Sequence, residues 1–105
     1  MVPPMAKALT EYRFLGQLAA LPCVQAVWLF GSRARGTARE RSDIDLAILC
    51  PGATRRQWQA VLDIVEAADT LLSIDAVRFD ALSAEDPLRA AILRDRQVLF
   101  ERVPA

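Results

Sequence analysis

The sequence predicts a single α/β (α+β) domain, in which helices flank a small mixed sheet of about four strands. Its length of 105 residues is typical of one domain, and an apolar content of 53% can form a core without disulfide or metal. Segments with helical apolar spacing alternate with short apolar runs, in the order α-β-α-β-α-β-α-β. Because no internal repeat or low-complexity segment interrupts this order, we assign residues 1–105 to one domain.

The first half of the chain predicts one helix and two strands. Residues 5–21 carry apolar side chains at helical spacing, and Pro22 ends the run. Residues 24–30 are short and almost continuously apolar, which is typical of a buried strand. A second apolar run over residues 43–50 predicts the next strand, which Pro51–Gly52 ends.

The second half predicts two helices and two strands. Thr54 and Gln57 have the spacing of a capping box, and apolar residues then follow one helical face as far as Leu72. We therefore expect a helix of about five turns. The remaining elements are a strand over residues 73–79, a helix that opens at Ser83, Asp86 and Pro87 and continues to about Arg94, and a short edge strand over 97–101.

A Gly-Ser turn and an Asp-x-Asp pair lie on either side of the first strand connection. Gly31 breaks the first apolar run, and Ser32 is expected to cap a short helix over residues 33–36. Asp43 and Asp45 open the second strand, and their spacing of two places both side chains on one face. Since only eleven residues connect the strands, we expect them to be antiparallel, with the turn beside the aspartates.

A third carboxylate is expected from the following crossover. The long helix should return the chain to a parallel neighbour, which brings Asp75 level with Asp45. Asp69 and Asp80 are rival candidates for this role. Asp69 falls on the predicted helix and Asp80 past the predicted strand, so Asp75 is the preferred residue.

Three converging carboxylates beside a Gly-Ser turn predict a phosphate and metal site. Acidic groups this close repel, and a hard divalent cation such as Mg²⁺ or Mn²⁺ relieves the repulsion. Two metal ions roughly 3.5–4 Å apart can stabilise the attacking and leaving oxygens of a phosphoryl substitution. Gly31 allows close backbone approach to a phosphate, and Ser32 can donate a hydrogen bond. The pattern favours in-line attack on the α-phosphate of ATP.

The stretch from Gly31 to Ile48, GSRARG followed by SDIDLAI, resembles the signature of the DNA polymerase β-like nucleotidyltransferases. It is most similar to the minimal nucleotidyltransferases, the smallest branch of that superfamily. The resemblance implies the polymerase β palm-like fold. It also implies that Gly31 and Ser32 bind phosphate, that Asp43 and Asp45 bind metal, and that Asp75 is the third carboxylate.

The resemblance further implies a partner and a reaction. Minimal nucleotidyltransferases are commonly paired with a small HEPN-type protein as a toxin–antitoxin module. This chain would then be an antitoxin that transfers AMP from ATP to a hydroxyl of the toxin, most simply a tyrosine, with Arg33 or Arg35 helping to position the triphosphate. Two alternatives stay open: transfer to a small molecule such as an aminoglycoside, by a homo-oligomer or with a separate binding subunit, and neutralisation of the partner by contact alone.

Composition excludes several other classes of function. The chain has 13 basic and 13 acidic residues, so its zero net charge argues against non-specific binding of nucleic acid. Histidine is absent from the sequence, which excludes His-based triads and metal sites. Cys23 and Cys50 lack metal-ligand spacing, and no apolar stretch approaches a membrane span. Since no signal peptide is recognisable, we expect a cytoplasmic protein with free thiols.

Overall fold

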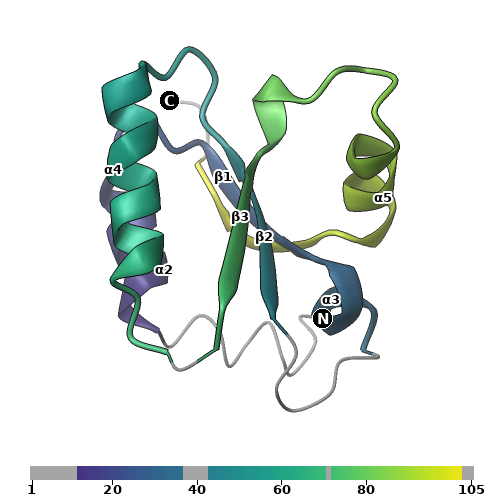
Figure 1. The fold of residues 1–105 in the computed structure, drawn as a ribbon, viewed down its shortest axis with the longest axis horizontal. Coiled ribbons are helices and arrows are strands. Elements are labelled where there is room, and N and C mark those ends of the chain that lie inside the picture. The colour runs from purple at the N-terminus through teal and green to yellow at the C-terminus, as the bar shows by residue number, and fades with distance from the viewer. Residues whose placement is uncertain (1–11, 37–42, 71, 103–105) are drawn as a thin grey trace.

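The computed structural model describes residues 12–36, 43–70 and 72–102, which form one four-stranded sheet with helices on both faces (Figure 1). The sheet has the strand order β3-β2-β1-β4. The strands are β1 (Ala26–Phe30), β2 (Ile44–Leu49), β3 (Ile74–Arg78) and β4 (Gln97–Glu101). The α/β fold class and the mixed sheet that the sequence predicts are confirmed.

The strand directions follow from the lengths of the connections. The short connection from β1 makes β2 its antiparallel neighbour, whereas the helical crossover after β2 returns the chain parallel to it as β3. β4 pairs with the other side of β1 and forms an edge of the sheet, as predicted. Every residue of β1 is buried, because this central strand is covered on both faces.

The first face of the sheet is covered by α2 (Arg13–Ala20) and α4 (Arg55–Glu66), which pack against each other, with α2 behind α4 in Figure 1. Fully buried apolar side chains from these helices meet those that β1 and β2 direct to the same side. This set includes Phe14, Leu18, Val27, Leu29, Ile44, Leu46, Ile48 and Val61. Burial of such side chains is the main stabilising contribution to the fold.

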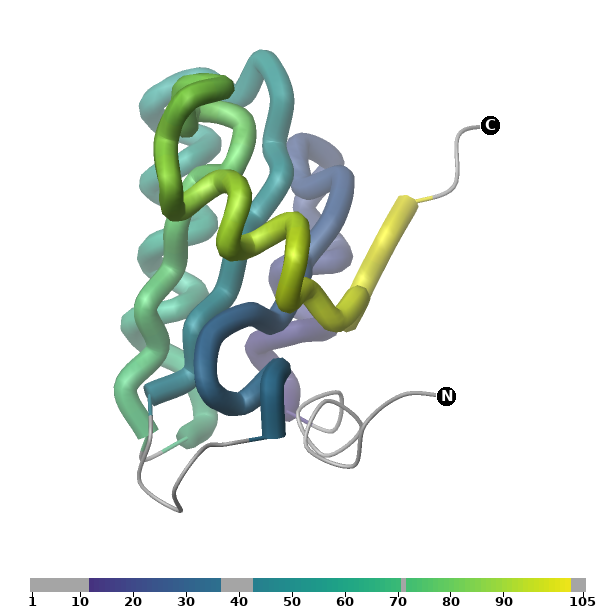
Figure 2. Tube along the Cα trace, turned by 90° about the vertical axis from the view of Figure 1, so that its right-hand side faces the viewer, coloured from purple at the N-terminus to yellow at the C-terminus, as the bar shows by residue number. Residues whose placement is uncertain are grey.

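The second face is covered only in part, by α3 (Gly31–Arg35) and α5 (Pro87–Asp95). Figure 2 looks onto this side and shows α5 in front of the sheet, with α3 below it and β4 at one edge. A smaller apolar cluster lies here, in which the rings of Trp28 and Phe79 meet edge to face, 4.9 Å between their centroids. None of the helices within the described residues has both the length and the apolar character needed to cross a bilayer.

Two helix predictions are confirmed only over part of their length. The predicted helix 5–21 is confirmed over Arg13–Ala20, and residues 5–11 lie outside the described part of the chain. The predicted capping box is present at the start of α4, since Thr54 and Gln57 exchange side-chain to main-chain hydrogen bonds of 2.8 and 3.1 Å. The predicted length of this helix was wrong, however, because α4 ends at Glu66 and not near Leu72.

The segment that follows α4 is tied to the start of α2. Asp69 accepts hydrogen bonds from the main-chain N–H groups of Arg13 and Phe14, at 3.1 and 3.2 Å. The bond from Arg13 is the main reason that the pKa of Asp69 is lowered. Ala68 and Leu72 still pack against the core from the loop. The apolar periodicity therefore continues beyond the end of the helix.

The start of α3 corrects the prediction that Ser32 caps a helix over residues 33–36. The helix begins at Gly31, with Phe30 in the N-cap position, so Ser32 lies inside it. Gly31 has a φ of 75°, a left-handed conformation that lets the chain turn directly from β1 into the helix. Gly36 has a φ of 77° and ends the helix at its C-cap.

A hydrogen-bonded latch holds the far end of β2 against β3. The main-chain N–H of Cys50 donates to Asp80 Oδ1 at 2.8 Å, and Arg78 donates to Asp80 Oδ2 at 3.0 Å. Arg78 also donates to the carbonyl oxygens of Cys50 and Ala53, at 3.1 and 3.2 Å. We call Cys50, Ala53, Arg78 and Asp80 the distal latch. It lies beyond the end of β3, where the sequence places Asp80.

Candidate active site

The strand register brings Gly31 directly beside Asp45. In the β1–β2 pair, Phe30 lies opposite Asp45, so the turn that follows Phe30 reaches the same end of the sheet. An added Cβ at Gly31 would overlap the Oδ2 atom of Asp45. Close backbone approach and the positive φ therefore both require glycine at this position. The predicted contact between the Gly-Ser turn and the Asp-x-Asp pair is present in the structure.

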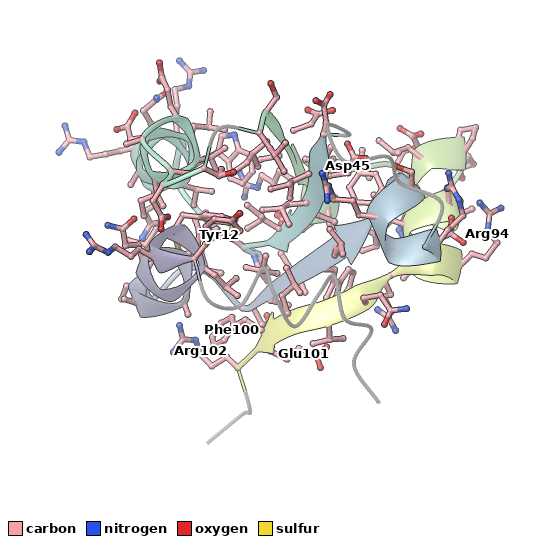
Figure 3. All side chains as sticks on the ribbon, turned by 90° about the horizontal axis from the view of Figure 1, so that it is seen from below. Tyr12, Asp45, Arg94, Phe100, Glu101 and Arg102 are labelled. Carbon is pink, nitrogen blue, oxygen red and sulfur yellow. The ribbon has the colours of Figure 1, made fainter. Side chains whose placement is uncertain are left out.

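The parallel register places Asp75 level with Asp45. The two residues are direct partners in the β2–β3 pair, so their side chains leave the same face of the sheet. The neighbours Ile44 and Leu46 point to the opposite face and are fully buried. In Figure 3, Asp45 lies between the sheet and α3, on the side away from α2 and α4. The Asp45 carboxylate therefore lies on the second face of the sheet, which α3 and α5 cover only in part.

Electrostatic coupling joins the three predicted carboxylates. The pKa of Asp45 is raised, first by burial and then by the negative charges of Asp75 and Asp43. The positive charges of Arg35 and Arg33 act in the opposite direction and lower this pKa. Asp43, Asp75, Arg33 and Arg35 thus all lie within electrostatic reach of Asp45. Ionised Asp45 is costly in the protein alone, and a bound cation would relieve that cost.

Arg33 occupies a different environment from the other charged residues of the turn. Only 4% of its surface is exposed, and its Nε donates to the main-chain carbonyl of Asp43 at 3.3 Å. This bond ties α3 to the residue that precedes β2, across a connection whose residues 37–42 lie outside the described part of the chain. Arg33 therefore helps to place Asp43, a contribution that the sequence alone did not indicate.

Arg35 forms an ion pair with Asp95, a residue that no sequence motif marks as part of the site. Its Nη1 lies 3.2 Å from Oδ2 of Asp95, the last residue of α5. Asp95 stands between Arg94 and Arg96 in the sequence, where a run of charges is usually a solvated surface. The only local signal was an acidic residue at a helix C-terminus, where the helix dipole disfavours negative charge.

The rival carboxylates take structural roles. Asp69 accepts hydrogen bonds at the start of α2, and Asp80 belongs to the distal latch. Four aromatic residues, Trp28, Phe30, Trp58 and Phe79, are predicted from the sequence to be core residues. Trp28, Phe30 and Phe79 are each at most 8% exposed, whereas Trp58 is only partly buried against the core. A pocket of about 430 Å³ lies beside the end of α4 and the start of β3, and none of the predicted site residues lines it.

The comparisons with known proteins agree with this geometry. Residues 17–105 match the family described as Polymerase beta, Nucleotidyltransferase, so the chain belongs to this nucleotidyltransferase family. No curated protein sequence matches the chain. The fold is shared with solved structures of toxin–antitoxin systems.

Three of these solved structures illustrate the likeness. A toxin–antitoxin structure with AMP-PNP is 24% identical, with a TM-score of 0.63, and the match covers 85% of this chain and 72% of that chain. An MNT antitoxin structure with a tri-AMPylated HEPN toxin from Shewanella oneidensis is 19% identical, with a TM-score of 0.57 and coverages of 93% and 71%. The toxin–antitoxin MntA-HepT is 21% identical, with a TM-score of 0.59 and coverages of 90% and 73%. At these identities the matches establish a common fold.

The residues present fit a divalent cation together with a nucleotide. The donor set is made of carboxylates, which suit Mg²⁺ or Mn²⁺, and the backbone of Gly31 lies directly beside the Asp45 carboxylate. Over residues 12–36, 43–70 and 72–102, no three His, Cys, Asp or Glu side chains are arranged to hold a metal ion on their own. Mg²⁺ is usually bound by one or two carboxylates plus substrate phosphates, so phosphate oxygens would complete the coordination.

Proposed function

We propose that this nucleotidyltransferase transfers AMP from ATP to a hydroxyl, a tyrosine in the simplest case, of a HEPN-type toxin protein and so acts as its antitoxin. The observation that carries the proposal is the close approach of Gly31 to Asp45, level with Asp75. It is supported by the likeness to an MNT antitoxin whose HEPN toxin is AMPylated and to a toxin–antitoxin structure with AMP-PNP.

In this proposal each site residue has a distinct task. Asp43 and Asp45 hold one or two divalent cations, which neutralise charge on the phosphates. Gly31 and Ser32 hold the outer phosphates through N–H and hydroxyl groups, and Arg35 adds positive charge beside them. Arg33 fixes Asp43 through its main-chain carbonyl.

Asp75 acts on the acceptor. Its carboxylate takes the proton of the attacking hydroxyl as the oxygen forms a bond to the α-phosphorus of ATP. The bond between that phosphorus and the bridging oxygen to the β-phosphate breaks, and pyrophosphate leaves. Asp75 is exposed on β3, at an edge of the sheet, where an acceptor side chain can reach it.

The direct test combines nucleotide binding with the mass of the partner. Calorimetry should detect ATP binding with Mg²⁺ or Mn²⁺, and a chelator should weaken it at least about tenfold because the phosphates lose their bridging cation. Incubation with the HEPN protein, ATP and Mg²⁺ should add one or more AMP units to that protein's mass. A partner that is neutralised yet unmodified would favour contact alone, and an adduct on a small molecule would favour the other alternative.

We further predict that Asp75 and Asp80 respond differently to replacement by asparagine. Asp75→Asn should lower transfer by about 100-fold, the usual contribution of a general base, while ATP still binds. Asp80→Asn should leave transfer unchanged and lower the free energy of unfolding by about 0.5–1 kcal/mol, since the ion pair with Arg78 is lost. Initial rates and urea unfolding measure the two effects. The reverse pattern in the rates would contradict the assignment of Asp75.

A further inference from the structure

Asp95 is an acidic residue at a helix C-terminus, a position that favours basic side chains. It is the last residue of α5, where the partial negative charge of the helix terminus makes an acidic side chain unfavourable. Two arginines offset this cost. Arg94 donates through Nε to Oδ1 at 3.0 Å and through Nη2 to Oδ2 at 3.1 Å, and Arg35 donates to Oδ2 at 3.2 Å. The carboxylate is 11% exposed, so it is well enclosed between them.

Arg35 lies between two acidic groups. It is the last residue of α3, three positions after Ser32 of the Gly-Ser turn, and its side chain is 48% exposed. Its nearest ion pair is with Asp95, and its charge also acts on Asp45, whose pKa it lowers. A long, exposed arginine side chain held by no partner would be free to turn toward Asp45. It would then compete with a cation for that carboxylate.

We propose that Asp95 is a positioning residue, which holds the Arg35 guanidinium against α5 so that it stays off Asp45 and faces the phosphates of a nucleoside triphosphate. The guanidinium carries five N–H donors, so the bond to Asp95 is compatible with a second bond to a phosphate oxygen. Arg94, which Figure 3 labels on the outer side of α5, also donates to Asp95. This inference rests on the proposed nucleotide site.

The pairing connects two segments that are 60 residues apart in the sequence. Through it, α5 supports α3, the helix that carries the Gly-Ser turn. Asp95 would not contact the nucleotide in this arrangement. Its effect on the nucleotide passes through Arg35, so it should disappear when Arg35 is removed.

The test is a double-mutant cycle on ATP binding, measured by calorimetry with Mg²⁺ present. Asp95→Asn should raise the Kd for ATP about two- to fivefold, the range expected for a single exposed ion pair. In an Arg35→Ala background the same change should have no further effect. Arg94→Ala is the matched control, since it removes the other partner of Asp95 and should leave the Kd close to that of the original protein.

The outcomes separate this inference from the proposed function. If the unmodified protein does not bind ATP, the proposed function is wrong and the inference falls with it. If the unmodified protein binds ATP and Asp95→Asn binds it equally well, only the inference is wrong. A loss of binding from Asp95→Asn that persists in the Arg35→Ala background would mean that Asp95 acts through the stability of α5, which also overturns the inference.

Discussion

Replacement of Gly31 by alanine is expected to be the most damaging single methyl addition in this protein. The new Cβ would overlap Asp45 Oδ2, and the φ of 75° is itself unfavourable for alanine. The left-handed conformation costs about 1–2 kcal/mol, and forced overlap adds about 1–3 kcal/mol. Because Asp45 or the turn must move, we also expect ATP binding with Mg²⁺ to be lost. Urea unfolding and calorimetry measure the two effects.

Gly52→Ala is the matched control for this prediction. Gly52 has a φ of 74°, and an added Cβ there has no neighbour within 4 Å. Its destabilisation therefore reports the backbone cost alone, and ATP binding should be unchanged. Combining Gly31→Ala with Asp45→Ala should recover most of the extra destabilisation, because the overlapping carboxylate is gone. Equal destabilisation by Gly31→Ala and Gly52→Ala would contradict the close approach of Gly31 to Asp45.

The second large effect is expected from Asp45→Asn, which should reduce transfer by about 1000-fold or more, since about 4 kcal/mol of charge stabilisation by the cation is lost. The fold should be retained, because Asp45 faces the site and not the main core. Initial rates of AMP transfer measure the loss. Asp63→Asn, an exposed change on α4, is the control and should have no effect on transfer.

In the absence of metal, the Asp45→Asn variant should be more stable than the original protein. The pKa of Asp45 is raised above its ordinary value of 3.8, so the folded protein binds this proton more readily than the unfolded chain does. The contribution of Asp45 to the free energy of unfolding therefore decreases as pH rises from 3.8 through the raised pKa of the folded protein. Asp45→Asn should raise Tm at pH 7, and the gain should vanish near pH 3. A lower Tm at pH 7 would instead indicate a structural role for this carboxylate.

The strands and their register could be predicted because connection length and period-two geometry constrain them. An eleven-residue connection requires antiparallel neighbours, and a helical crossover then places Asp75 beside Asp45, as the structure confirms. The end of α4 could not be predicted in this way. Ala68 and Leu72 pack against the core outside the helix, so the apolar pattern contains no sign of where the helix stops.

Two details of the site depend on contacts that are distant in the sequence. The chain turns directly from β1 into α3 because Gly31 adopts a positive φ beside Asp45, and a Gly-Ser pair alone does not determine this. Asp95 gains its importance from Arg35, 60 residues away, whereas its neighbours suggested only a solvated charge run. The spacing of residues in the sequence predicts where the carboxylates lie. The contacts that orient the arginines depend on how the helices pack, which the spacing does not predict.

The distal latch and the carboxylates occupy opposite ends of one strand. Asp45 and Cys50 are five residues apart, or about 16 Å along β2. Substitutions separated by such a distance usually change stability additively. The electrostatic cost of the aspartates at one end can therefore be offset by hydrogen bonds at the other without any direct contact between them. An engineer who seeks a more heat-resistant form can strengthen the surroundings of Asp80 and leave the chemistry around Asp45 untouched.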